Sequence, residues 1–318
     1  MIRFILENLI DSATLTDSPS SDTSYPVDNI TKVHRSEVCR SVSTPAIQSY
    51  LGNWSTDKTA SALVIGRHNF SQYVSYQLIL YDGINQTGSE VFNSGVIQLT
   101  YSEAATDYIQ WGEFRWGIKP WDYNKKDVEN IQFKNIVLWF PLTTFRSCKI
   151  AFSGPTGTVD AVYCNSQDVF CNSISVFCND SGTTTSQDIG IPFYEVGRIF
   201  LGEYLEPTYN ISFDHSISWQ ENTTQYRAGS GTLKSDITTK NKRFTFDLNT
   251  IPESDRIGIQ KKLVNLGLTK DFFISIFPED TNSDKVLDYS GIVKLTRVPR
   301  YTEVRCGYYK SNYVAEEV

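Results

Sequence analysis

The stretch at residues 60–83 constrains the fold more than any other part of the sequence. It reads ASALVIGRHNFSQYVSYQLILYDG and consists of two short apolar runs joined by a polar segment. The runs at residues 62–65 and 76–81 are rich in β-branched, aromatic and aliphatic side chains, and their length is typical of strands buried in a sandwich core. Residues 66–71 between them contain Gly, Asn and Ser, which favour turns. We therefore predict two core strands, with the polar segment as the turn that sets their register.

Composition supports a chain built mainly of strands. The 318 residues include 18 Tyr and 18 Phe but one Met, and a chain of this length has room for two domains. The net charge of −7 argues against a nucleic-acid partner, because binding a phosphate backbone needs a concentrated Lys/Arg surface. No stretch approaches the roughly 20 apolar residues of a membrane span, so we predict no membrane span. From the composition we predict an all-β protein. We assign the apolar residues 1–10 to the first strand.

Six sequence blocks follow one another in an order that carries a family resemblance. They are residues 25–30 with Pro26 and Asn29, Arg35-Ser36, the block at 62–71, and the strand-like blocks at 89–95, 147–153 and 194–202. This order resembles the discoidin-like, galactose-binding-like β-sandwich found in structural proteins of tailed-phage tails. The resemblance implies that residues 1–205 form a jelly-roll β-sandwich with insertions at about 108–130 and 160–190.

The character of the sequence changes after residue 205. Alternating patterns predict strands at residues 207–219, 242–248, 272–278 and 291–295, and residues 279–285 form a predicted turn. Residues 252–266 form the predicted helix, with Thr250 as its cap and Gly267 as its left-handed C-terminal residue. The order resembles the small β-domain that follows the sandwich in the same tail proteins, so residues 206–318 are predicted to form a C-terminal β-domain with one helix.

The first insertion contains Trp111, Trp116 and Trp121 at five-residue intervals. Three tryptophans could form a platform for stacking on a sugar. An odd spacing places successive side chains on opposite faces of an extended strand, which favours packing in the core or at a subunit interface. Both hypotheses remain open from the sequence, and the interface hypothesis is preferred.

The second insertion is a repeat with a period of seven residues, in which Cys164, Cys171 and Cys178 are each followed by Asn. Three equally spaced cysteines raise the hypothesis of a metal or iron–sulfur site with Cys39, Cys148 or Cys306 as a fourth ligand, or of a disulfide. No Cys-x-x-Cys pair is present, so the spacing favours buried thiols. No cofactor is predicted.

Candidate catalytic residues are sparse. His34, His68 and His215 are the only histidines, and none lies in a known catalytic motif. For His68 a structural role, as a hydrogen-bond donor to a carbonyl at a sheet edge, is preferred to contact with a ligand. A glycosidase needs two neighbouring carboxylates, and Glu113, Asp122 and Asp127 are candidates only because they lie among aromatic residues. We therefore expect a protein that is not an enzyme.

The resemblance implies a structural component of a phage tail tip or baseplate, located in the virion. Its partners would be further copies of itself in a symmetric oligomer and other tail proteins, namely the tail tube, the hub and the tape-measure region. The alternative is a carbohydrate-binding module that contacts host surface glycans, with the tryptophan-rich insertion as the binding loop.

Overall fold

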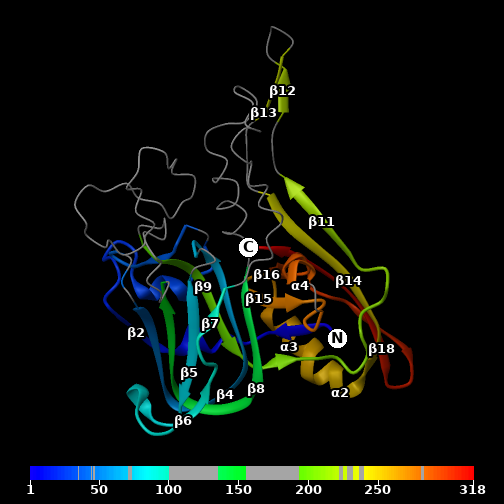
Figure 1. Ribbon diagram of the computed structural model, residues 1–318. Coiled ribbons are helices and arrows are strands. Elements are labelled where there is room, and N and C mark those ends of the chain that lie inside the picture. The colour runs from blue at the N-terminus through cyan, green and yellow to red at the C-terminus, as the bar shows by residue number, and fades with distance from the viewer. Residues whose placement is uncertain are drawn as a thin grey trace, which may run out of the picture.

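The computed structural model describes the whole chain except residues 35, 44, 46, 71–73, 100–134, 155–192, 222–224, 228–231, 236–239 and 281–282. The described strands form two eight-stranded sheets and a separate two-stranded ribbon. Figure 1 shows the two sheets side by side, with the ribbon extending away from them. The prediction of an all-β fold, a sandwich with a smaller β-domain, is confirmed.

The first sheet builds the sandwich, in the strand order β3-β9-β4-β8-β5-β6, with β2 beside β4 and β7 beside β5. Its strands are β2 (Thr14–Ser18), β3 (Cys39–Arg40), β4 (Ile47–His68), β5 (Ser75–Tyr81), β6 (Glu90–Asn93), β7 (Ile97–Gln98), β8 (Ile136–Ser153) and β9 (Glu195–Gly202). Three short 3-10 helices accompany these strands: η1 (Leu9–Ser12) precedes β2, η2 (Val27–Thr31) lies between β2 and β3, and η3 (Ile84–Gln86) lies between β5 and β6.

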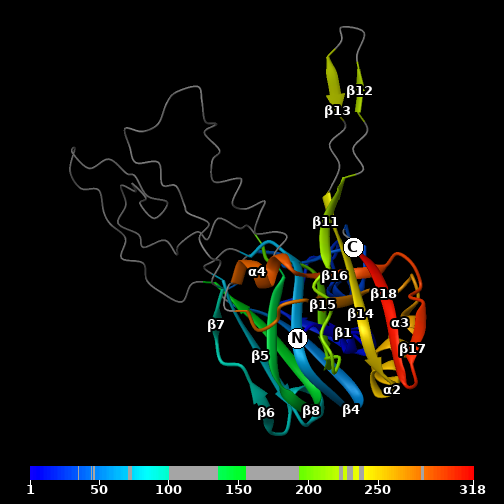
Figure 2. The same ribbon diagram turned by 90° about the vertical axis from the view of Figure 1, so that its right-hand side faces the viewer.

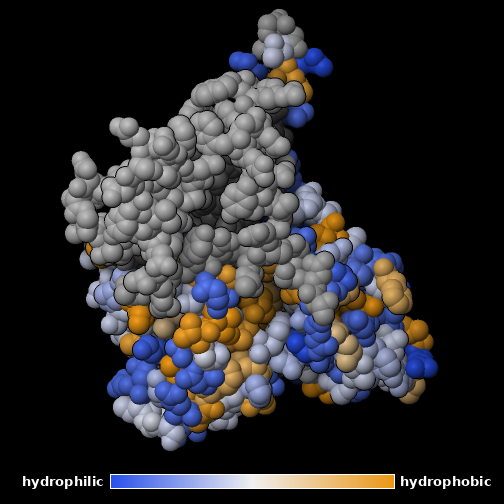
Figure 3. All heavy atoms as spheres, viewed as in Figure 1, coloured by the Kyte–Doolittle hydropathy of each residue, from blue (hydrophilic) through white to orange (hydrophobic). Residues whose placement is uncertain are grey.

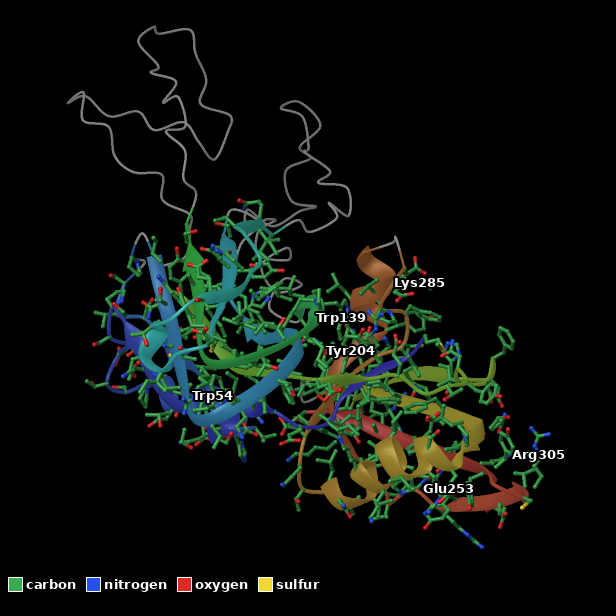
Figure 4. All side chains as sticks on the ribbon, turned by 90° about the horizontal axis from the view of Figure 1, so that it is seen from below. Trp54, Trp139, Tyr204, Glu253, Lys285 and Arg305 are labelled. Atoms are coloured by element: carbon green, nitrogen blue, oxygen red, sulfur yellow. The ribbon has the colours of Figure 1, made fainter. Side chains whose placement is uncertain are left out.

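The long strands β4 and β8 pair along nearly their whole length and change register where the sandwich curves. The register shifts between Asn53 and Lys58 and again between Ala60 and Ala62, and such irregularities increase strand bending. Trp54 lies at this curve (Figure 4) and packs edge-on against Phe145 with ring centroids 5.2 Å apart. Its indole N–H donates to the carbonyl of Leu9 at 3.0 Å, so the largest apolar side chain of the curve is also hydrogen-bonded.

The two apolar runs predicted as core strands lie in β4 and β5, but the predicted register between them is wrong. β8 lies between β4 and β5, and it pairs with both. The end of β4 is already paired with β9 on its other side, from Ala62 to His68. Both edges of β4 are therefore occupied, and the polar segment after it carries the chain past β8 instead of closing a hairpin.

The second sheet has the strand order β10-β1-β15-β16-β18-β14-β11, with β17 beside β18. Its strands are β1 (Arg3–Ile5), β10 (Tyr204–Leu205), β11 (Ser216–Glu221), β14 (Lys240–Pro252), β15 (Phe272–Ser275), β16 (Ser290–Leu295), β17 (Tyr301–Arg305) and β18 (Tyr308–Glu317). Its helical segments are α2 (Glu253–Asp255), the π-helical η4 (Arg256–Gln260), α3 (Lys261–Leu266) and α4 (Ser283–Asp288).

The first strand joins the second sheet and not the sandwich, which differs from the predicted division at residue 205. Phe4 pairs with Ile274 on one side and with Leu205 on the other. Alternation explains the placement, because successive side chains of a strand point to opposite faces. Phe4 enters the core of the second sheet, whereas Ile5 enters a third apolar cluster between the two sheets.

The helix predicted at residues 252–266 is present as the continuous run α2, η4 and α3. Gly267 ends it with φ 63°, as predicted. The predicted cap is wrong, because Pro252 and not Thr250 occupies the N-cap position and no side chain caps the first turn.

Two strand and turn predictions also need correction. Within residues 207–219 only the end is strand, in β11, and the predicted turn at 279–285 contains the start of α4. The paired strands β15 and β16 lie where they were predicted.

A buried arginine joins the sandwich to the second sheet. Arg198 on β9 has a side chain that is 1% exposed. It donates from Nε to Asp271 Oδ2 at 2.9 Å and from Nη1 to Asp11 Oδ1 at 2.5 Å. Asp11 belongs to η1 beside the sandwich, and Asp271 directly precedes β15 of the second sheet. Burial alone would lower the pKa of Arg198, but the hydrogen bonds and charges of the two carboxylates raise it above its ordinary value.

Apolar packing surrounds this joint. The third cluster combines side chains from both sheets: Ile5, Ala62, Val64, Phe200, Phe273 and Ile292. The backbones approach so closely that a Cβ on Gly202 would lie 2.3 Å from the carbonyl oxygen of Glu7.

A second arginine reinforces the same joint. Arg3 lies over the rings of Trp139 and Tyr204, at 4.9 and 4.5 Å, and these rings meet between the two sheets (Figure 4). It also pairs with Glu206 at 2.7 Å. The two sheets thus share one continuous packed boundary.

We predict that Arg198→Met lowers the free energy of unfolding by about 3–5 kcal/mol, because it leaves the buried Asp271 carboxylate without its partner. Arg40→Met is the matched control, since Arg40 pairs with Glu195 but both side chains are 26% exposed, and it should cost about 1 kcal/mol or less. Urea unfolding followed by fluorescence measures both. Equal losses for the two variants would contradict the role assigned to Arg198.

Candidate functional site

The two insertions singled out in the sequence lie outside the described residues. This applies to Trp111, Trp116 and Trp121, to Cys164, Cys171 and Cys178, and to the acidic candidates Glu113, Asp122 and Asp127. Their sugar-binding, interface and metal hypotheses therefore stay predictions.

The other three cysteines are far from equivalent. Cys39 and Cys148 are buried in the sandwich core, whereas Cys306 is exposed at the end of the β17–β18 hairpin. Burial raises the pKa of the Cys148 thiol to about 12. Within the described ranges, no group of three His, Cys, Asp or Glu side chains lies close enough together to hold a metal ion.

His68 has a structural setting in the sandwich core. Its ring is 2% exposed and stacks on Phe70 with centroids 4.8 Å apart. Its Nδ1 accepts the backbone N–H of Phe70 at 3.2 Å, so this nitrogen is an acceptor and not a donor to a sheet-edge carbonyl. The polar segment thereby fixes Phe70 in the sandwich core.

The two remaining histidines lie apart from it. His34 is exposed next to η2. His215 lies in the second sheet's half of the chain, edge-on to Phe277 at 5.6 Å. The structure does not bring the three histidines into one site.

A small polar cleft lies beside the joint between the two sheets. Its volume is about 220 Å³, which is below the usual range of small-molecule sites. Its lining contains side chains of both charges: the carboxylates of Glu7, Asp57 and Glu203 and the ammonium groups of Lys58 and Lys262. This mixed charge and small size give the cleft no clear ligand class.

A β-ribbon extends from the second sheet. β11 and β14 pair from Ser216↔Thr245 to Glu221↔Lys240. Farther out, β12 (Gln225–Arg227) and β13 (Leu233–Ser235) pair as a sheet of two strands. Figures 1 and 2 show this excursion, which we call the arm (β11, β12, β13 and the start of β14), reaching away from both sheets.

The arm exposes large apolar side chains. Trp219 is 62% exposed, Tyr226 50% and Leu233 52%. Trp219 lies over the ammonium of Lys242 at 5.3 Å. Trp and Tyr are enriched in protein interfaces, so the arm has the composition of a contact surface.

A second exposed surface lies at the far end of the second sheet. Arg305 lies over the ring of Tyr308 at 4.1 Å, and Tyr301 meets Tyr309 edge-on at 6.0 Å. Glu253 pairs with Arg256 nearby, and that hydrogen bond lowers the pKa of Glu253. Figure 4 places Glu253 and Arg305 at the end of the sheet away from the sandwich. This Tyr–Arg surface is also of a type that is common in interfaces.

Neither surface was singled out from the sequence. Gly229, Ser230 and Gly231, which are residue types that favour turns, lie between β12 and β13 in the sequence. The alternating pattern of a strand does not show whether it extends beyond its sheet. That depends on which other strands pair with it, and those strands can lie far away in the sequence.

In the orientation of Figure 1, apolar and polar residues are interspersed over the described surface, with apolar residues gathered near the boundary of the two sheets (Figure 3). Among the described residues, no helix is long and apolar enough to cross a membrane.

Comparison with known proteins gives no family for this chain. No protein-family model matches it, and no curated protein sequence matches it. Among solved structures it is similar to chitosan-binding module 1 of a chitosanase/glucanase from Paenibacillus sp. IK-5, at 10% identity and a TM-score of 0.34, over 61% of this chain and 98% of that chain.

Two further solved structures show the same degree of similarity. A Streptococcus pneumoniae fucose binding module matches at 12% identity and a TM-score of 0.33, over 62% of this chain and 94% of that chain. A Ruminococcus gnavus GH29 fucosidase in complex with fucose matches at 10% identity and a TM-score of 0.33, over 63% of this chain and 27% of that chain. Similarities at this level do not establish a shared function.

We predict that thiol reactivity separates the cysteines that the structure describes. In a variant with Cys164, Cys171 and Cys178 replaced by Ser, one thiol, Cys306, should react rapidly with a thiol reagent at roughly pH 8, because buried thiols hold almost no thiolate there. All three remaining thiols should react after unfolding in urea. Rapid labelling of Cys39 or Cys148 in the folded variant, identified by mass spectrometry, would contradict their burial.

Proposed function

We propose that this protein is a non-enzymatic structural component of a phage tail, which assembles with itself and with neighbouring tail proteins. The observation that carries the proposal is the arm, which extends from a rigidly joined pair of sheets and exposes Trp219, Tyr226 and Leu233. An isolated two-stranded ribbon is marginally stable in water. A ribbon with these side chains is suited to a protein partner that covers it.

The joint between the sheets supports the same proposal. Arg198 and the third apolar cluster hold the sandwich and the second sheet together, so that surfaces on both keep a fixed separation. Fixed geometry is what a closed symmetric assembly requires of its subunits. The order of the sequence blocks resembles that of phage tail structural proteins, and this supports our proposal of an assembly in the virion, beside the tail tube, the hub or the tape-measure region.

Glycan binding is the second candidate function. The sandwich and the exposed aromatic side chains, such as Tyr301 and Trp219, are compatible with it. The chitosan- and fucose-binding modules named above are of this class, but their TM-scores of 0.33 to 0.34 are too low to carry the candidate. The predicted binding loop with Trp116 lies outside the described residues.

Light scattering coupled to size-exclusion chromatography tests the choice between the two functions. We expect the purified chain to form a defined oligomer at micromolar concentration or on mixing with neighbouring tail proteins, and to give no signal on a glycan array. A strict monomer under both conditions that binds a glycan with micromolar affinity would reject assembly in favour of the second candidate. Trp116→Ala then serves as the control, since it should abolish glycan binding only if the insertion is the binding loop.

A further inference from the structure

The outer ribbon of the arm presents an apolar and a basic side chain on each of its two faces. Residues that pair directly across two strands share a face. Tyr226 pairs with Lys234, and Arg227 pairs with Leu233. The first pair therefore lies on one face of the ribbon and the second pair on the other, since successive side chains alternate.

Charge is distributed unevenly along the chain. Residues 216–243, which make up the arm, contain five Lys or Arg and two Asp or Glu, a net charge of +3. Residues 1–205 contain 14 Lys or Arg and 21 Asp or Glu, a net charge of −7, while residues 206–318 are balanced at 15 of each. The arm is thus a basic extension of a chain whose sandwich half is acidic.

Among the described residues, one end of the strand order of the sandwich sheet combines an acidic side chain with apolar side chains. β6 ends the strand order of the sheet, next to β5. Val91 is 40% exposed there, with Ile84 at 48% and Val96 at 68% close by in the sequence. Glu90, on the same strand, is exposed. Edge strands present unpaired backbone groups that another chain can cover.

From these features we infer that the arm of one copy docks on the β6 edge of the sandwich of a neighbouring copy. Lys234 then faces Glu90, and Tyr226, on the same face of the ribbon as Lys234, covers the apolar side chains at that edge. The two surfaces differ, so the contact is heterologous and repeats from copy to copy until the ring closes. This inference rests on the proposed function, because it names the contact through which the assembly forms.

Charge exchange between the two surfaces tests the contact. Lys234→Glu places two carboxylates together, and like charges across an interface weaken binding. We expect the dissociation constant for self-association to rise about tenfold at low salt, as measured by sedimentation velocity over a range of concentrations. Combining Lys234→Glu with Glu90→Lys should restore association.

Lys261→Glu is the matched control for charge, because Lys261 is exposed on α3 and belongs to neither of the two exposed surfaces described above. It should leave association unchanged. Tyr226→Ser removes the apolar contact and should also weaken association, while the thermal midpoint stays unchanged because this side chain does not belong to a core cluster.

The possible outcomes separate this inference from the proposed function. If the unmodified chain is a monomer both alone and with tail proteins, the proposed function and this contact both fail. If it assembles and the arm variants assemble equally well, only this contact is overturned. If Lys234→Glu and Lys261→Glu weaken association to the same extent, the effect comes from net charge and the contact is again overturned.

Discussion

The buried guanidinium of Arg198 is the interaction on which the rest of the structure depends. It is nearly inaccessible to water, and it bonds to one carboxylate beside the sandwich and one beside the second sheet. A buried charge is tolerated only when it is paired and hydrogen-bonded. Neither part of the protein provides both partners, so Arg198 is fully satisfied only when the two parts are together. The ion-pair geometry also fixes how they are oriented, which apolar packing alone does less well.

The rigid joint fixes the position of the arm relative to the β6 edge of the sandwich. The arm leaves the second sheet, while the β6 edge with Glu90 lies on the sandwich. If the two sheets moved freely, a contact between the arm of one copy and the edge of the next would not fix the geometry of an assembly. With the joint closed by Arg198, Arg3 and the third apolar cluster, each copy carries both contact surfaces in a constant relation.

The sequence predicted where strands and the helix lie better than it predicted which strands lie next to each other in a sheet. Alternation and β-branched composition located the core strands in β4, β5, β15 and β16, and Gly267 was recognised as the end of the helix. The placement of β8 between β4 and β5 was not predictable from local pattern, because strand order is decided by pairing between residues far apart in the chain. The same reason explains β1, whose apolar residues indicate a strand but do not say which sheet it joins.

The candidate site shows the same limit. Sequence motifs drew attention to the tryptophans and the cysteine repeat, whereas the arm is defined by strands that extend beyond their sheet and by its exposed side chains.

Differential scanning calorimetry tests the central claim, that the sandwich and the second sheet form one unit. The account predicts one transition whose calorimetric and van't Hoff enthalpies agree. Two separate transitions, one for each sheet, would contradict it.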